Sequence, residues 1–193
     1  MSAAEVLTSA ISSTPDVDLA DRHRYGDATA FEEIYERFAP MVYNLCLRLS
    51  GDSCRAQDLS QEIFMRVFKG LKRFRGRSSL RTWIYRIALN HCRSRLGRKR
   101  LLLEELSSEL DEGTLADPSH GPERRLIAKD CGRQVAVALV QLPRCFREAV
   151  VLRDIEGFSY GEIAGLLGVR VGTVRSRIAR GRERLRIVLE SRA

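Results

Sequence analysis

The residues best suited to chemistry form one long basic run in the first half of the chain. Between Arg66 and Arg100 there are thirteen Lys or Arg residues and no Asp or Glu. Positive side chains release counterions when they meet a phosphate backbone, and aromatic faces between them can stack on unpaired bases. The aromatic residues within this run are Phe68, Phe74, Trp83 and Tyr85. A solvated helix face normally mixes charges of both signs, so the run indicates nucleic-acid binding.

A second basic segment lies near the C-terminus, where residues 171–187 contain six Arg and one Glu. A short helix at 160–167, a turn at Gly168 and a longer helix at 171–189 predict a helix-turn-helix, whose second helix lies in the major groove. Successive helical residues are about 100° apart, which places Val174 and Ile178 on the buried face. The candidate DNA contacts on the other faces are Gly172, Arg175, Ser176, Ala179, Arg180 and Arg184.

The elements that must position these residues are predicted to be helices throughout, because no alternating strand pattern occurs in the sequence. Pro40 is expected to kink or split the second helix. Trp83 lies on the apolar stripe of the fourth helix, so we expect it to pack in the core first and to stack on a base second. The expected helices cover about 16–24, 28–50, 53–71, 80–96, 123–142, 143–154, 160–167 and 171–189.

The chain is therefore predicted to be all-α, with two small helical domains joined by a flexible acidic linker. Gly, Pro and Glu residues set the linker apart, and residues 101–130 carry eight acidic and three basic groups. The expected divisions are a disordered N-terminus at 1–15, a first domain at 16–98, a linker at 99–122 and a second domain at 123–190.

Composition excludes several other classes of protein. The five Cys and three His residues have no metal-ligand spacing, so no metal site and no cofactor are expected. No nucleophile signature, phosphate loop or paired catalytic carboxylates are present, so we expect no enzyme. The chain has no signal peptide and no apolar run of roughly 20 residues. These features predict a cytoplasmic protein that makes no membrane contact of its own.

Several blocks of sequence, in the right order from about Asp18 to Leu189, match one known family. The chain resembles an extracytoplasmic-function (ECF) sigma factor of the sigma-70-like family. The most specific blocks are Asp58-Leu59-x-Gln61-Glu62-x-Phe64, Phe74-Arg75-Gly76-x-Ser78-x-Leu80-x-Thr82-Trp83-Ile84-Tyr85-Arg86-Ile87-Ala88-x-Asn90, Ser159-Tyr160-x-Glu162-Ile163-Ala164 and Gly172-Thr173-Val174-Arg175-Ser176-Arg177.

This resemblance implies a transcription initiation factor that binds the RNA polymerase core and promoter DNA, with an anti-sigma factor as a further partner. The first domain would be sigma region 2 and the second sigma region 4. The implied polymerase contacts are Asp58, Gln61, Glu62 and Phe64. The implied contacts to the minus-ten element, held as single-stranded DNA, are Arg77, Ser78, Arg81, Tyr85, Arg86, Asn90 and Arg93. The last helix would recognise the minus-thirty-five element as duplex.

An alternative stays open at this point. An ordinary helix-turn-helix regulator could bind DNA without being part of the polymerase, but it would need no basic run in its first half and most such proteins dimerise. Binding of purified protein to duplex promoter DNA, with and without polymerase core, would separate the two hypotheses.

Overall fold

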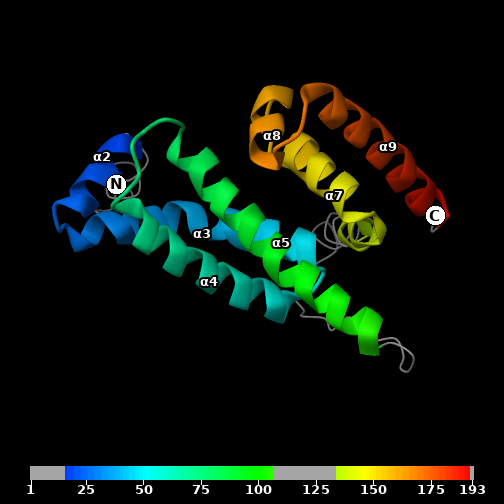
Figure 1. The fold of residues 1–193 in the computed structure, drawn as a ribbon, viewed down its shortest axis with the longest axis horizontal. Coiled ribbons are helices and arrows are strands. Elements are labelled where there is room, and N and C mark those ends of the chain that lie inside the picture. Colours follow the sequence, from blue (N-terminus) through cyan, green and yellow to red (C-terminus); the bar gives the residue numbers. More distant parts are fainter. Residues whose placement is uncertain (1–15, 107–133, 192–193) are drawn as a thin grey trace, which may run out of the picture.

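The computed structural model describes residues 16–106 and 134–191, and these residues form helices joined by short loops, without a strand (Figure 1). The predicted all-α class is confirmed. Predictions for residues 1–15 and 107–133 lie outside the described residues. The elements are α2 (Asp16–Arg24), α3 (Ala28–Ser50), α4 (Ser53–Leu71), α5 (Leu80–Leu106), α7 (Arg144–Val150), the π-helix η1 (Val151–Ile155), α8 (Tyr160–Leu167) and α9 (Val171–Glu190). Residues 134–141 are also helical.

Helices α2 to α5 form what we call the N-terminal unit, in which α3 packs along α4 and both contact α5 (Figure 1). Side-chain caps fix where these helices begin. Asp27 accepts a hydrogen bond from the Thr29 backbone N–H (2.9 Å), and Asp52 accepts one from Arg55 N–H (3.0 Å). The core of the unit is apolar and includes Ile34, Val42, Leu45, Leu59, Ile63, Val67, Leu80, Ile84 and Leu89.

In this unit one helix continues past a proline, and the end of another was predicted wrongly. Helix α3 is not split and runs through Pro40 to Ser50, because the apolar face on both sides of the proline is buried in the same core. Helix α5 does not end near Leu96 but continues to Leu106, into the first residues of the expected linker. Residues 101–106 are Leu and Glu, which are strong helix formers, so nothing in their composition stops the helix.

Residues 134–191 form the C-terminal unit, which contains the predicted helix-turn-helix. Ser159 and Glu162 make a reciprocal capping box at the start of α8, and Gly168 ends α8 with a φ of 67°. The helix predicted over about 143–154 is present, but it is α-helical only as far as Val150. It then continues to Ile155 as the π-helix η1, a wider turn that is frequent at functional sites.

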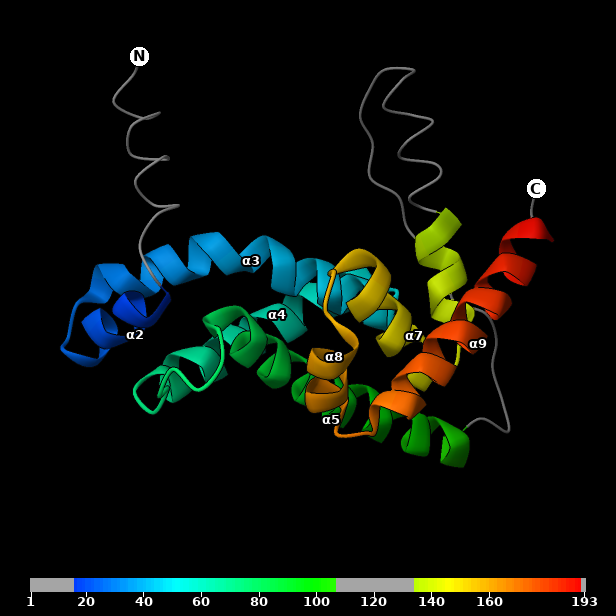
Figure 2. The same cartoon turned by 90° about the horizontal axis from the view of Figure 1, so that it is seen from above.

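The C-terminal unit lies against the N-terminal unit, with α8 next to α5 and α7 next to the end of α3 (Figures 1 and 2). Buried residues of both units, among them Leu89 and Phe158, belong to one continuous apolar cluster. The sequence predicted the two units but not their contact.

Candidate nucleic-acid interface

The face of α9 that points away from the protein carries the predicted duplex contacts. Gly172, Arg175, Ser176, Ala179, Arg180 and Arg184 are all exposed. Val174, Ile178 and Gly181 lie on the opposite side and are buried. The spacing in the sequence thus placed both faces correctly, and small residues beside Arg allow the helix backbone to approach base edges.

The arginines of α9 differ in whether they form ion pairs with carboxylates of the protein. Arg182 donates to Asp154 (Nε to Oδ2, 3.0 Å), and Arg186 pairs with Glu183 and Glu190, both at 2.8 Å. Arg180 is exposed and has no ion-pair partner among the residues that the structure describes. Its guanidinium is thus available for bidentate pairing with a base.

Two further arginines of this helix are oriented by aromatic rings. The Arg184 guanidinium lies 5.1 Å from the centre of the Phe146 ring, and that of Arg175 lies 5.7 Å from the centre of the Tyr160 ring. A cation over a ring face is attracted by the ring quadrupole, so these contacts reduce the freedom of two positive groups at the edges of the face.

The predicted minus-ten residues divide into two groups. Arg77, Arg86 and Asn90 are exposed, and Ser78 is half-buried. They lie on the loop between α4 and α5 and on the outer face of α5, where they can reach a nucleic-acid strand. Arg81, Tyr85 and Arg93 instead face the C-terminal unit.

Tyr85, one of the implied minus-ten contacts, is not at the surface of the protein. Its side chain is fully buried, its hydroxyl donates to Glu156 Oε2, and its ring meets that of Phe158 edge-on at 4.8 Å. Burial and the nearby Glu156 carboxylate raise the pKa of Tyr85 well above its ordinary value. The helical period of α5 gave the direction of the side chain but could not reveal a neighbour so far along the chain.

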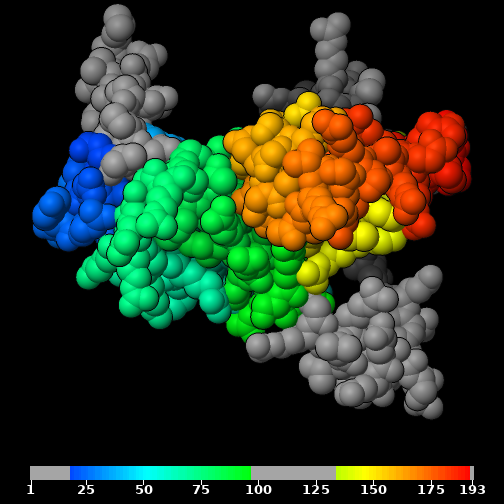
Figure 3. Space-filling model, turned by 45° about the horizontal axis from the view of Figure 1, so that its top comes forward, coloured from blue at the N-terminus to red at the C-terminus, as the bar shows by residue number. Residues whose placement is uncertain are grey.

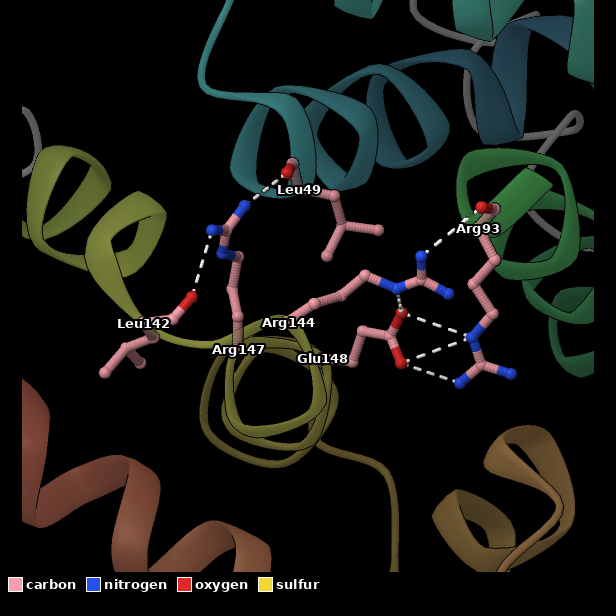
Figure 4. A network of polar contacts seen from close by, with 6 residues as sticks. All are labelled: Leu49, Arg93, Leu142, Arg144, Arg147 and Glu148. Carbon is pink, nitrogen blue, oxygen red and sulfur yellow. Dashed lines mark hydrogen bonds and ion pairs between the residues drawn. The ribbon is translucent and has the colours of Figure 1, made fainter. Parts of the chain in front are cut away.

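Arg81 and Arg93 are also engaged by the C-terminal unit. Arg81 donates to the Glu156 carbonyl (2.6 Å), and its guanidinium lies 4.4 Å from the centre of the Phe158 ring. Arg93 forms an ion pair with Glu148 (Nη2 to Oε2, 2.7 Å), which also accepts from Arg144 (2.9 Å), as Figure 4 shows.

Arg24 of α2 holds the loop between α4 and α5 and was missed by sequence reasoning. Its guanidinium donates to the carbonyls of Phe74 (2.5 Å) and Lys72 (3.3 Å) and to Asp21 (2.6 Å). Arg24 also lines a cavity of about 660 Å³ together with Asp21 and loop residues 72–76. The sequence indicated only that Arg24 lies in the last turn of α2, and not that it contacts the loop.

Trp83 packs as expected against the core side of the same loop. Its ring lies 5.3 Å from that of Phe74, and α4 makes room for it at Gly70, where an added Cβ would lie 3.1 Å from the indole. The tryptophan therefore supports the loop from within the N-terminal unit.

Helix α4 presents two of the four predicted polymerase contacts freely. Asp58 and Gln61 are exposed. Glu62 pairs with Arg95 (2.9 Å) and His91 (2.5 Å) of α5. Burial acts to raise the pKa of Glu62, but the hydrogen bonds from Arg95 and His91 outweigh it and lower the pKa below its ordinary value.

Phe64 is the exception in this set, because it is only 4% exposed and lies under Tyr35, with ring centres 4.8 Å apart. Its predicted role as a direct polymerase contact has no exposed surface to support it. The apolar stripe of α4, which also includes Ile63 and Val67, accounts for its burial.

Within residues 16–106 and 134–191, no cluster of three or more His, Cys, Asp or Glu side chains is arranged to hold a metal ion. None of the helices in the same two ranges is long and apolar enough to cross a membrane.

Comparison with known families gives two matches in the order of the two units. The model for Sigma-70 region 2 matches residues 34–101, and the model for Sigma-70 region 4 matches residues 132–185.

Curated relatives match along most of the chain. The RNA polymerase sigma-H factor of Pseudomonas aeruginosa is 33% identical over 87% of this chain and 90% of its own length. The ECF RNA polymerase sigma-E factor of Escherichia coli is 36% identical over 87% and 91%. The ECF RNA polymerase sigma factor SigE of Mycolicibacterium smegmatis is 41% identical over 83% of this chain, which spans 63% of that longer protein.

Two solved structures resemble the whole arrangement. The sigma factor RpoE from Bartonella quintana, in complex with the anti-sigma factor NepR, matches with a TM-score of 0.69 and 26% identity, over 83% of this chain and 96% of its own. CnrH, in complex with the cytosolic domain of CnrY, matches with a TM-score of 0.66 and 25% identity, over 92% and 99%.

Proposed function

The chain belongs to the ECF group of the sigma-70 family of RNA polymerase sigma factors, and we propose that it directs a polymerase core to promoters and opens them. The observation that carries the proposal is the pair of basic faces on separate helical units, each within the residues that one family model matches. An independent helix-turn-helix regulator would need only the second unit, so the first unit favours the sigma factor.

In this proposal the two units act on different forms of DNA. The exposed face of α9 binds the duplex minus-thirty-five element, with Arg175 and Arg180 at base edges and Arg184 at the phosphates. The α4–α5 loop and the outer face of α5, with Arg77, Arg86 and Asn90, hold the minus-ten strand after melting.

Helix α4 is the proposed contact to the polymerase core. Asp58 and Gln61 are free to reach a basic partner, and Glu62 contributes negative charge beside them. The protein supplies recognition and no catalytic group of its own. We further propose a cytoplasmic location, and restraint by an anti-sigma factor, as NepR is for RpoE.

Transcription in vitro with purified core polymerase tests this function. Core enzyme with the chain should start at a defined set of promoters that core alone does not use, which sequencing of the transcripts would reveal. An unchanged set of start sites would contradict the proposal.

The polymerase contact is tested by Asp58→Arg. This change puts a cation in place of an exposed anion and should abolish co-purification with core while the helical circular dichroism stays the same. Glu36→Arg makes the same charge change at an exposed position of α3 and should leave core binding intact. Equal core binding by both variants would remove Asp58 from the contact.

A further inference from the structure

The last turn of α2 reaches the loop between α4 and α5, and the two lie next to each other at the end of the molecule far from α9 (Figures 1 and 3). The Arg24 guanidinium makes the contact. Its Nε donates to the Lys72 carbonyl (3.3 Å) and its Nη2 to the Phe74 carbonyl (2.5 Å), while Nη1 donates to Asp21 Oδ1 (2.6 Å). A guanidinium is planar and holds its donors in fixed directions. Arg24 therefore fixes the position of two loop carbonyls relative to α2.

Helix α2 is a firm support for this arginine, because its inner face is part of the core. Leu19 and Ala20 are at most 1% exposed. The ring of His23 meets that of Phe68 on α4 close to edge-on, with ring centres 5.0 Å apart. Arg24 thus extends from a helix that is packed in place, and the core of the N-terminal unit sets its reach to the loop.

A cavity lies between the loop and α2. It has a volume of about 660 Å³ and is lined by Asp21, Arg24 and residues 72–76. On its other side the loop is anchored by Phe74, which is 3% exposed and packs against Trp83. Apolar packing thus fixes one side of the loop, and the hydrogen bonds of Arg24 fix the other side across the cavity.

The supported backbone leads directly to two predicted contacts to promoter DNA. Arg77 and Ser78 follow Phe74 by three and four residues. Gly76 turns the chain between Phe74 and Arg77 with a φ of 66°, a conformation that other residues rarely adopt. Over so short a stretch, a shift of the Phe74 carbonyl is passed on to both side chains. Groups that recognise a ligand must be held to within about 0.5 Å of their productive positions, so recognition depends on this support.

We propose that Arg24 is a positioning residue for the minus-ten element. It acts through the backbone of the α4–α5 loop, which it holds in the conformation that lets Arg77 and Ser78 recognise bases. The inference rests on the proposed function, because it concerns the loop assigned there to the melted strand. Helix α2 lies before residue 34, where the match to Sigma-70 region 2 begins. The support therefore comes from outside the segment that carries the family pattern.

Arg24→Lys is the sharpest substitution, because it separates charge from geometry. Lysine keeps the positive charge but offers one compact ammonium group in place of a planar fork, so it cannot bridge the same acceptors. Arg24→Gln removes the charge as well. A positioning role predicts that the two variants behave alike, whereas a phosphate contact by Arg24 predicts that lysine largely replaces arginine.

Arg22→Lys is the matched control, because it makes the same change two residues earlier on the same helix. Arg22 donates to Asp27 (2.8 Å) and Thr29 (3.1 Å) and pairs with Glu33 (3.0 Å). These partners lie at or near the start of α3 and not in the loop, and a lysine can still pair with the two carboxylates. The control should therefore match wild type in the two measurements that follow.

The first measurement is transcription by the full-length protein with core polymerase from a library of minus-ten sequences. At the base positions that the loop recognises, the ratio between the best and the worst base should fall about tenfold in both Arg24 variants. Preference among upstream sequences and co-purification with core should stay as in wild type, because α9 and α4 are unchanged. A general loss of stability would lower initiation at all promoters together and leave the ratio unchanged.

The second measurement is hydrogen exchange of the free protein, followed by mass spectrometry of peptides that cover residues 70–80. The N–H groups of Arg73 and Phe74 donate to the carbonyls of Gly70 (2.9 Å) and Leu71 (3.0 Å), so they report on the loop backbone. Their exchange should be about tenfold faster in both Arg24 variants, because hydrogen bonds to a charged group are lost. Peptides from α3 should exchange as in wild type, which would show that the variants are folded.

Other outcomes overturn the inference. If Arg24→Lys keeps the base preference while Arg24→Gln weakens all sequences equally, Arg24 is a phosphate contact. If loop exchange is faster but the base preference is unchanged, the support has no role in recognition. An equal change in Arg22→Lys would assign the effect to the docking of α2 as a whole. If wild type adds no start sites to core, the proposed function itself fails, and the exchange result alone then shows whether Arg24 holds the loop.

Discussion

Individual side chains decide which part of each basic face is available to DNA. On α9, Arg182 and Arg186 are bound by carboxylates of the same unit, whereas Arg180 is exposed at the centre of the outward face. Phosphate contacts position a protein and base contacts give it specificity. The pairing pattern thus makes Arg180 the strongest candidate for sequence recognition.

Arg180→Ala should cost about 1–3 kcal/mol of binding and relax the base preference at one position of the upstream element. The reason is loss of a bidentate contact to a base edge. Transcription by the variant holoenzyme from a library of upstream sequences would measure this. A uniform loss for all sequences would instead make Arg180 a phosphate contact.

A buried histidine gives the N-terminal unit a dependence on pH. His23 is 6% exposed, lies among the rings of Phe31 and Phe68, and its Nε2 has no hydrogen-bond partner among the described residues. Burial, together with the charge of Lys72, lowers the pKa of His23 below its ordinary value of 6.5. The folded protein therefore favours the neutral ring.

The sign of the pH effect follows from proton binding. Below pH 6.5 the unfolded chain protonates this histidine before the folded chain does, so the free energy of unfolding should fall as the pH falls. His23→Phe keeps an aromatic ring and removes the titration. Denaturant unfolding at a series of pH values should show a smaller decline below pH 6.5 for the variant. Parallel curves would contradict this origin.

How well single residues could be predicted depended on where their neighbours come from. The exposed face of α9 was placed correctly because it depends only on the period of one helix and on Val174 and Ile178 opposite it. Tyr85 was misplaced because Glu156 and Phe158 belong to the other unit. Phe64 was assigned to a partner although the apolar stripe of its own helix buries it.

Helix packing in the C-terminal unit depends on one close approach. Helix α9 crosses α7 at Gly181, where an added Cβ would lie 2.6 Å from Cγ2 of Val150 and 3.4 Å from Cβ of Phe146. Val150 is itself buried, so it has little room to move. Because Gly181 has no side chain, α9, the recognition helix, can pack directly against α7.

Gly181→Ala should therefore destabilise the protein by about 1–3 kcal/mol through overpacking. Gly165→Ala is the matched control, because Gly165 is a helical position of α8 with no atom within 4 Å of the added Cβ. The control should instead gain about 0.5–1 kcal/mol from better helix propensity. Thermal unfolding of the two variants would show shifts of opposite sign. A gain in both would mean that α7 and α9 can move apart freely.

At the level of elements, the starts of helices were easier to predict than their ends. Asp27, Asp52 and Ser159 mark N-termini through caps that local sequence specifies. Helix α5 continues through Gly97, a residue type that often follows the end of a helix, and η1 differs from an α-helix in that its hydrogen bonds span five residues instead of four. Neither feature has a signature in composition or period.

For the whole molecule, the sequence predicted two helical units and their order but not how they face each other. Glu156 accepts hydrogen bonds from Arg48, 108 positions away, and from Tyr85, 71 positions away, and a pattern of apolar residues does not reveal such polar contacts. In the folded protein Glu148 and Glu156 face the basic run of the other unit.

The place of Trp83 has a practical consequence, because it is the sole indole in the chain. Its ring packs against Phe74 at the base of the α4–α5 loop. The tryptophan fluorescence of the protein therefore reports on this loop alone. Quenching, or a change of emission wavelength when an oligonucleotide is added, would show that the loop has rearranged. Such a measurement can use the native protein without an attached dye.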